Sequence, residues 1–360
     1  MNEIETKLAL IRRVLAQHNL TALRLRGVDW FAWATGGGSS VIILTNEAGV
    51  ADVLVTADQA LVLTDSMEFD RLEAEEVPPE YTVWSAPWHS STARDAFVRE
   101  VTGGGAVASD RPCAAEQPLP AALCTAKRRL LPAEVERYRR LGALAASAVT
   151  EALTAARPDW TELDLAGAAA EALWSRGIHP TLTVVGGERR LPLYGHLTST
   201  GERLGGRAML VVCGRQHGLY ANLTRFVQFR PLTAEEQNWA AVVAEIESVA
   251  WRASRPGAVL ADVHGAIVAA YAAQGYPGAE DRLHQGGTTG YLSREAVARP
   301  GETTVIEANT ALAWNPALRG QKIEDTILTT DQGLEILTVD PVWPTAEING
   351  YPRPLPFQAA

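Results

Sequence analysis

The first third of the chain contains two kinds of hydrophobic and polar pattern. Apolar residues recur every three to four positions over residues 8–18, which predicts an amphipathic helix. Four short apolar runs, separated by Gly, Asn and Asp, then predict β-strands. The four runs, all within residues 21–65, are TALRLRG, SSVIILTN, ADVLVTA and QALVLTD. Helices between mostly buried strands predict an α/β layer over about residues 1–130.

A long helix is predicted to begin at Pro132, because proline suits the first turn of a helix and apolar residues then recur every three to four positions. Two more helices are predicted to begin at Thr161 and Thr233, because each threonine is followed three residues later by an acidic residue, as in a capping box. We therefore predict an N-terminal domain over residues 1–130 and a C-terminal domain over residues 131–360.

The C-terminal half also repeats itself. Residues 157–177 and 255–275 align without gaps: both begin with Arg-Pro, contain Asp-x-x-Gly-Ala and end with Gly. Helix capping alone would explain single Pro and Gly residues but not the shared register. A duplicated α/β unit is therefore the favoured interpretation, and it predicts a site at the interface between the two copies.

Composition narrows the class of protein. A formal net charge of -10 argues against a nucleic-acid partner, which would need a basic face. No apolar run of about 18 residues occurs, so no membrane partner is expected. The N-terminus lacks a signal-peptide layout, and three cysteines without a CxxC pair favour a reducing compartment. These features predict a cytoplasmic protein.

Four segments of the C-terminal half carry a resemblance. They are residues 131–157, GRAMLVVCGRQHGLYANLTRFV, LHQGGTTGY and TTVIEANTALAWNPALRGQKIEDTILTTDQG, in that order. They resemble the opening helix, the hairpin, the HxxGHGxG segment and the last two strands, with their TIEPG and RIEDT motifs, of the pita-bread metallopeptidases: methionine aminopeptidase, aminopeptidase P, prolidase and the metal-free creatinase. The resemblance implies an α+β protein, with a curved antiparallel sheet flanked by helices in the C-terminal domain. A smaller creatinase-like α/β domain would precede it.

The resemblance also implies where metal ligands would stand. The family holds two divalent cations with two Asp, one His and two Glu. The matching positions here are Val211 or Val212, Asn222, Thr288, Glu307 and Glu324. Because only two of these are carboxylates, we expect no cofactor. One weakly held divalent cation (Mn, Mg or Zn) on Asn222, Glu307 and Glu324 is the alternative.

Four side chains are the expected catalytic group. If Glu307 and Glu324 lie close together in a dry pocket, one of them should have a raised pKa and the pair could transfer protons. His284 matches the first His of the HxxGH segment, and His196 lies three residues beyond the substrate-side His of the family. The alternatives are solvent-facing strand glutamates and structural histidines.

Five further side chains are expected to contact substrate, because the resemblance places them at or beside the same pocket. They are Asn222, Thr288, Glu295, Lys322 and Trp314. Glu295 stands where the family has a further His, and Lys322 where it has an Arg.

The favoured function is a Xaa-Pro peptidase-like or creatinase-like hydrolase that acts on a small amide or peptide-like C–N substrate without two metals. Two alternatives stay open: an inactive relative that binds a peptide or small ligand, and a single-metal Xaa-Pro dipeptidase or aminopeptidase. The expected partners are a small molecule or short peptide and, from the resemblance and the commonness of symmetric pairs, a second copy in a homodimer.

Overall fold

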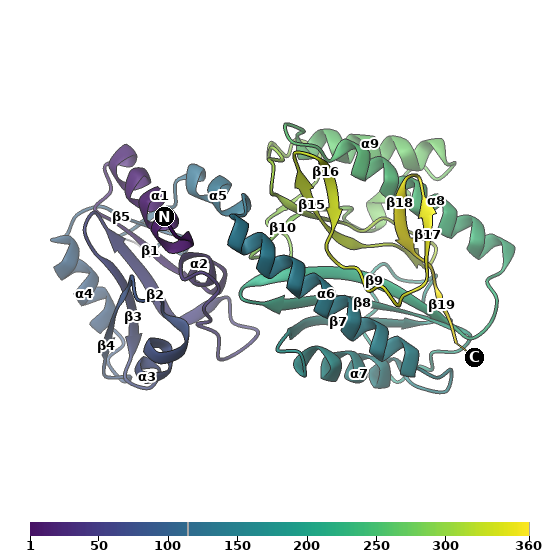
Figure 1. The fold of residues 1–360 in the computed structure, drawn as a ribbon, viewed down its shortest axis with the longest axis horizontal. Coiled ribbons are helices and arrows are strands. Elements are labelled where there is room, and N and C mark those ends of the chain that lie inside the picture. The colour runs from purple at the N-terminus through teal and green to yellow at the C-terminus, as the bar shows by residue number, and fades with distance from the viewer. Residues whose placement is uncertain (114, 360) are drawn as a thin grey trace. The chain divides into compact units, whose positions relative to one another are not determined.

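The computed structural model describes residues 1–113 and 115–359 and divides into two compact units, Met1–Glu134 and Val135–Ala360 (Figure 1). The division falls inside the first turns of helix α6 (Pro132–Ala155), close to the boundary predicted at residue 130. Each unit has its own sheet structure and its own buried apolar residues.

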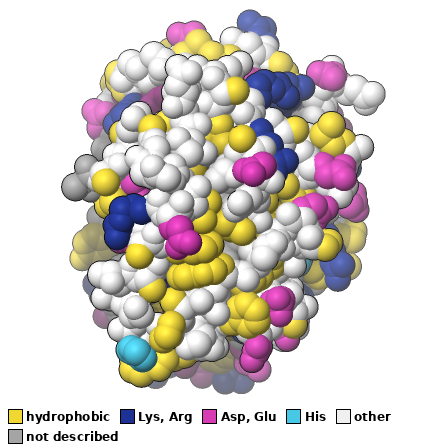
Figure 2. Space-filling view, turned by 90° about the vertical axis from the view of Figure 1, so that its left-hand side faces the viewer, with side chains coloured by type: hydrophobic (Ala, Val, Ile, Leu, Met, Phe, Trp, Pro, Cys, Tyr) yellow, Lys and Arg dark blue, Asp and Glu magenta, His cyan; other side chains and the backbone are white. Residues whose placement is uncertain are grey.

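The N-terminal unit is built on one six-stranded sheet with the order β4-β3-β2-β1-β5-β6. Its strands are β1 (Ala22–Gly27), β2 (Ala48–Thr56), β3 (Ala60–Asp65), β4 (Thr82–Ala86), β5 (Val107–Ser109) and β6 (Gln117–Pro118). Its helices are α1 (Glu3–His18), α2 (Val28–Ala34), α3 (Phe69–Arg71), the π-helical turn Leu72–Glu76, α4 (Ala93–Thr102) and α5 (Ala121–Arg128). A capping box between Asn2 and Glu5 begins α1, one turn earlier than the apolar pattern predicts. Figure 2 shows one face of the molecule, where hydrophobic side chains gather towards the middle of the view and side chains of both charges are scattered around them.

Three of the four predicted N-terminal strands are confirmed as β1, β2 and β3, but the prediction for SSVIILTN is wrong. Residues 41–47 form a loop, and Ile42 and Ile43 are 55% and 57% exposed. The two edges of β1 are already paired, antiparallel with β2 and parallel with β5. Local hydrophobicity therefore could not place this run in the sheet.

The C-terminal unit contains two arrays, which are antiparallel except where β19 pairs in parallel with β9, and two pairs of helices. The first array has the order β19-β9-β8-β7 and the second β11-β10-β12-β15-β16. The main strands are β7 (His179–Gly187), β8 (Arg207–Gln216), β9 (Leu219–Gln228), β10 (Gly286–Thr289), β11 (Ala296–Val297), β12 (Ala311–Trp314), β15 (Asp325–Thr330) and β16 (Gly333–Ile336). The short strands are β13 (Ala317–Leu318), β14 (Gln321–Lys322), β17 (Thr345–Ile348), β18 (Tyr351–Pro354) and β19 (Phe357–Gln358).

The same succession of elements occurs twice in this unit, as the internal repeat predicts. Helices α6 and α7 (Glu162–Trp174) precede the first array, and α8 (Ala234–Ala253), α9 (Leu260–Ala273) and a 3₁₀ turn (Ala279–Arg282) precede the second. Capping boxes begin α7 at Thr161 and α8 at Thr233. Apolar side chains of α8 and α9, such as Trp251 and Ile267, form one buried cluster with Trp314 and Ile327 of the second array.

The two arrays meet at Glu324, immediately before β15. Thr224 of β9 donates its backbone N–H to the Glu324 carbonyl at 3.0 Å, an isolated antiparallel bridge. Glu324 therefore lies at the seam between the two copies of the repeat, where the duplication predicts a site.

Candidate active site at the seam of the two arrays

Glu324 is the centre of the candidate site. Its side chain is 2% exposed and is held by three donors from three segments. Arg294 Nη2 lies 2.7 Å from Oε1, Lys322 Nζ lies 2.9 Å from Oε2, and Thr224 Oγ1 donates to Oε2 at 3.1 Å. Both carboxylate oxygens are thus bonded to a cationic side chain.

This arrangement keeps Glu324 ionised. Burial by itself would raise the pKa of the carboxyl, but Lys322 and Arg294 oppose it through charge and hydrogen bonds and lower the pKa to about 2. Glu324 is therefore not the glutamate with the raised pKa that a facing pair would require. A carboxylate this acidic cannot donate a proton at neutral pH and is a weak base.

A cavity of about 120 Å³ adjoins Glu324. Its lining combines apolar strand residues with polar groups from distant segments. The lining residues are Leu182, Val184, Gly195, His196, Met209, Val211, Cys213, His284, Ser293, Arg294, Asn315, Lys322 and Glu324. Arg294 Nε and Asn315 Oδ1 are both buried and have no hydrogen-bond partner among the described residues. Such atoms stabilise a bound ligand that offers the missing partner.

The two predicted histidines lie together at this cavity. The ring centroids of His196 and His284 are 6.1 Å apart, and both residues are exposed to solvent at the mouth of the cavity. Partial burial, followed by the positive charge of Arg294, lowers the pKa of His284 to about 4, although Glu324 opposes this. Solvent on the open side screens part of that effect, but the direction leaves His284 neutral at neutral pH.

Glu307 does not join this site, so the predicted Glu307–Glu324 pair is wrong. Its backbone amide donates to Thr310 Oγ1 at 3.3 Å and its carbonyl accepts from Thr329 Oγ1 at 2.7 Å, and its side chain is absent from the described lining of the cavity. The strand register explains the error. Trp314 pairs with Asp325 across β12 and β15, so the next residue, Asn315, lies opposite Glu324.

Of the five expected substrate contacts, Lys322 lines the cavity and the other four are absent from its described lining. Thr288 is fully buried and its Oγ1 accepts from Ala296 N at 3.0 Å. Asn222 donates to Thr289 Oγ1 at 3.0 Å. Trp314 is a core residue, and its Nε1 donates to Ser254 Oγ at 2.9 Å.

Glu295, the last of these, accepts from Tyr291 N at 3.0 Å, while its neighbour Arg294 reaches Glu324. The expected polar contact therefore comes from position 294 rather than 295. A count of residues from a motif gave the wrong register because the loop between β10 and β11 is not a regular strand.

Cys213, Arg294 and Asn315 are among the residues of the site that sequence reasoning missed. Val211 and Cys213 line the cavity, whereas Val212 points to the other face of β8 and is fully buried. Burial, followed by the charge of Glu324, raises the pKa of the Cys213 thiol to about 11, so this cysteine is a neutral wall residue. A signal for Asn315 was present, because it directly precedes Pro316 as the family's Glu precedes Pro in TIEPG.

Two helix pairs around two antiparallel arrays, with a site at their seam, define a pita-bread domain. The chain belongs to metallopeptidase family M24, whose family model matches residues 136–331. Solved structures with the same fold extend over both units. A prolidase from Pyrococcus horikoshii OT3 is 16% identical with a TM-score of 0.77, covering 93% of this chain and 98% of that one. An X-Pro aminopeptidase from Thermotoga maritima MSB8 is 16% identical with a TM-score of 0.75 and the same coverage.

Two further proteins are similar to this chain, one in fold and one in sequence. The N-terminal domain of the FACT complex subunit SPT16 from Cicer arietinum is 12% identical with a TM-score of 0.69, covering 94% of this chain and 96% of that one. Agropine synthesis cyclase of Rhizobium rhizogenes is 28% identical over 144 residues, which are 37% of this chain and 36% of the relative. The match thus spans about a third of that protein's length. Within residues 1–113 and 115–359, no helix is both long and apolar enough to cross a bilayer.

The donor set at the seam does not fit the pair of divalent cations that the family name implies. Glu324 is the one carboxylate among the described lining residues, and both its oxygens are already bonded to Arg294 and Lys322. The other positions offer neutral groups, namely Asn222, Asn315 and the apolar wall at Val211. Hard divalent cations need several anionic or carbonyl oxygens to offset the loss of their water.

Proposed function

We propose that this chain is a metal-independent enzyme of the M24 family that acts on the C–N bond of a small amide-like substrate. The observation that carries the proposal is the Arg294–Glu324–Lys322 cluster beside a cavity that also holds His284. Cationic side chains stand at the cavity, and a neutral base stands next to them.

The two cations are suited to stabilise negative charge on a substrate carbonyl oxygen. Glu324 fixes both side chains in place, and Arg294 Nε still has an unused N–H. Preorganised donors in a site of low dielectric are effective because they need no rearrangement as charge develops. Glu324 thus acts as a positioning residue rather than as the acid or base of the sequence-based hypothesis.

Proton transfer falls to His284. A histidine whose pKa lies near 4 is neutral at pH 7 and has a free nitrogen to accept a proton. His196, with its ring centroid 6.1 Å away, is near enough to bind the same substrate or to relay a proton through one water. The partner of Asn315 Oδ1 would be an N–H of the substrate.

The similarity to agropine synthesis cyclase supports a second candidate, an enzyme that closes a ring instead of hydrolysing a bond. The same groups would serve that reaction, because an attacking nucleophile also needs a base and its carbonyl target also needs cationic donors. The difference lies in whether water or a second group of the substrate attacks.

The test combines metal analysis with turnover. Protein purified without added metal is assayed, before and after EDTA, against N-acyl amino acids, N-carbamoyl amino acids and Xaa-Pro dipeptides. We expect turnover that survives EDTA, and a decrease in kcat of about 10²-fold or more in His284→Gln. His264→Gln, a half-buried helix residue of the same unit, is the matched control.

Each other outcome supports a different function. Turnover that EDTA abolishes and Mn²⁺ restores would support a single-metal peptidase. Ligands that raise Tm without any turnover, in wild type and His284→Gln alike, would support a binding protein. A cyclic product that has released the amine without gaining water would favour ring closure.

A further inference from the structure

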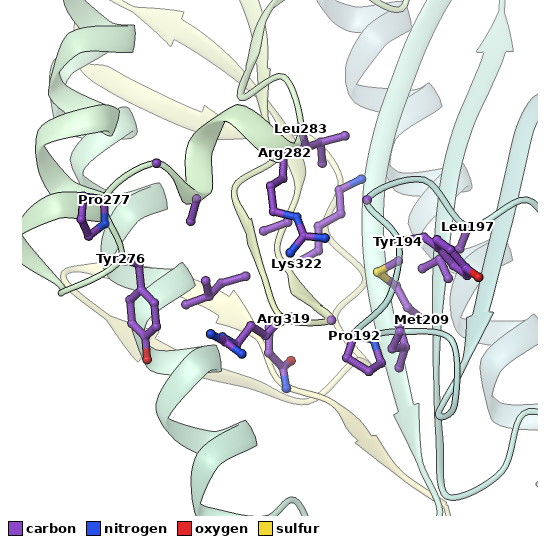
Figure 3. A pocket seen from close by; sticks show the side chains of 18 of the residues that line it. Pro192, Tyr194, Leu197, Met209, Tyr276, Pro277, Arg282, Leu283, Arg319 and Lys322 are labelled. Carbon is purple, nitrogen blue, oxygen red and sulfur yellow. The ribbon is translucent and has the colours of Figure 1, made fainter.

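A second and larger cavity opens beside the seam site. It has a volume of about 420 Å³ and shares Gly195, Met209 and Lys322 with the smaller one. Figure 3 shows the side chains of Arg282 and Arg319 between the Tyr276–Pro277 loop and a wall that includes Pro192 and Met209. A molecule bound at Lys322 would therefore extend into this outer cavity.

All the charged side chains in the described lining of the outer cavity are cationic. Arg282, Arg319 and Lys322 line it, and its described lining contains neither Asp nor Glu. The whole chain has a net charge of -10, so the positive lining of this cavity contrasts with the negative charge of the protein as a whole. A concave surface of one sign concentrates counter-ions and raises the rate of their association.

Within the described residues, neither Arg282 nor Arg319 forms an ion pair that stabilises the fold. Across the described parts of the chain, no carboxylate pairs with Arg282 or Arg319. Arg319 instead lies 5.8 Å from the ring centroid of Trp239 on α8, a cation–π contact that orients the guanidinium and leaves its N–H donors free. Structural arginines elsewhere in this unit, such as Arg230 and Arg353, each contact two carboxylates.

The backbone at Arg319 adds an independent observation. Arg319 and Gly320 form the two-residue turn between β13 and β14, and both have positive φ, 47° and 82°. Turns of this kind favour Asn or Asp before Gly, because a larger side chain is strained in the left-handed region. Arginine is thus a poor choice for the fold at this position, and strained residues cluster at functional sites.

We infer that Arg282 and Arg319 form a carboxylate subsite, so that the substrate is a C–N compound bearing a carboxylate on the part remote from the reacting bond. The inference rests on the proposed function for the position of that bond. Planar guanidinium groups match a carboxylate with paired hydrogen bonds. The 420 Å³ volume admits a group of several carbon atoms between Lys322 and the two arginines.

Binding of a simple dicarboxylate tests the subsite without any assumption about catalysis. Glutarate and its uncharged analogue glutaramide are titrated by calorimetry into wild type, Arg282→Gln, Arg319→Asn and the double variant. We expect glutarate to bind wild type at least tenfold more tightly than glutaramide, and each single variant to lose about tenfold in glutarate affinity. Arg255→Gln, an exposed arginine of the same unit, should bind glutarate as wild type does.

Arg319→Asn separates a ligand role from a structural one. Because Asn suits the turn better than Arg, its Tm should equal or exceed that of wild type while its affinity for glutarate falls. A lower Tm with unchanged affinity would overturn the inference, as would equal binding of glutarate and glutaramide. Inorganic phosphate that binds as tightly as glutarate would also overturn it, since the site would then select charge alone. Failure of these titrations leaves EDTA-resistant turnover, the test of the proposed function, unaffected.

Discussion

Two buried glutamates of the C-terminal unit, Glu324 and Glu247, both have cationic partners, but their pKa values shift in opposite directions. Glu247 of α8 is 1% exposed and accepts two hydrogen bonds from Arg353, both at 2.7 Å. Arg353 also pairs with Asp325 at 2.8 Å, and Asp325 pairs with Arg225 at 2.7 Å. Burial raises the pKa of Glu247 to about 7, and Arg353 only partly opposes this. The pKa of Glu324 is lowered to about 2.

The ratio of carboxylates to cationic side chains in each cluster explains why the two pKa values shift in opposite directions. The core group has two carboxylates and two arginines, so each negative charge is also repelled by another. The seam cluster has one carboxylate between Arg294 and Lys322 and so keeps an excess of positive charge. Loss of one member of a balanced, closed network leaves a buried charge uncompensated, whereas an unbalanced cluster beside a cavity is suited to a ligand of the opposite charge.

The largest effect should come from breaking the balanced network. Arg353→Met leaves two buried carboxylates facing one arginine, and we expect a loss of about 3–5 kcal/mol in the free energy of unfolding. Arg294→Met should cost clearly less, because Lys322 still pairs with Glu324 and water can enter the cavity. Urea denaturation of both variants measures the two values. Equal losses would contradict the distinction between a structural and a ligand-facing cluster.

Removing the central carboxylate of the seam should give the next largest effect. Glu324→Gln leaves two cations without a negative partner, and we expect a loss of about 1–3 kcal/mol that acetate restores by occupying the cavity. Glu247→Gln is the matched control, because its closed surroundings leave no room for acetate. Thermal melts in acetate and in chloride at equal ionic strength check this. Rescue of both variants, or of neither, would remove the evidence for an anion site at the seam.

Much of the fold was predictable because its signals are local. Capping boxes at Thr161 and Thr233, and the duplicated pattern of residues 157–177 and 255–275, specify helix starts and repeated units directly in the sequence. The strand prediction at Ile42 and Ile43 was wrong because hydrophobicity does not reveal whether a sheet edge is free. That information depends on pairing between distant segments.

The site was less predictable than the fold, for the same reason. Glu324 and Lys322 lie in the conspicuous KIEDT segment, and both line the cavity. Glu307 has the expected type of ligand side chain, but the register of β12 on β15 places Asn315 opposite Glu324. In a diverged site, position is therefore a better guide than residue type.

The two glutamates should also give stability changes in different pH ranges. The folded-state pKa of Glu247, about 7, exceeds its ordinary value of 4.5, so its contribution is present below about pH 4.5 and is lost as pH rises through 7. The pKa of Glu324, about 2, lies below 4.5, so its contribution is present above pH 4.5 and is lost as pH falls towards 2.

Urea unfolding from pH 3 to pH 8 measures both slopes. Wild type should lose stability on each side of a maximum near pH 5. Glu247→Gln should lack most of the loss above pH 5, and Glu324→Gln most of the loss below it. Identical pH profiles for wild type and both variants would show that neither carboxyl is perturbed by its partners.

The smallest effect should be the response of wild type to divalent cations. Since Arg294 and Lys322 occupy both oxygens of Glu324, a cation would have to displace them and would find only neutral donors beside them. With a Kd weaker than about 10 mM, 1 mM Mn²⁺ or Mg²⁺ would stabilise the fold by less than about 0.1 kcal/mol, which is below the resolution of a thermal melt. The double variant Arg294→Met/Lys322→Met frees the carboxylate and should show a larger, though still modest, rise in Tm with Mn²⁺. A rise of several degrees in wild type, or two tightly bound equivalents after dialysis, would show that the cationic side chains yield to metal and that the family's metal chemistry is retained.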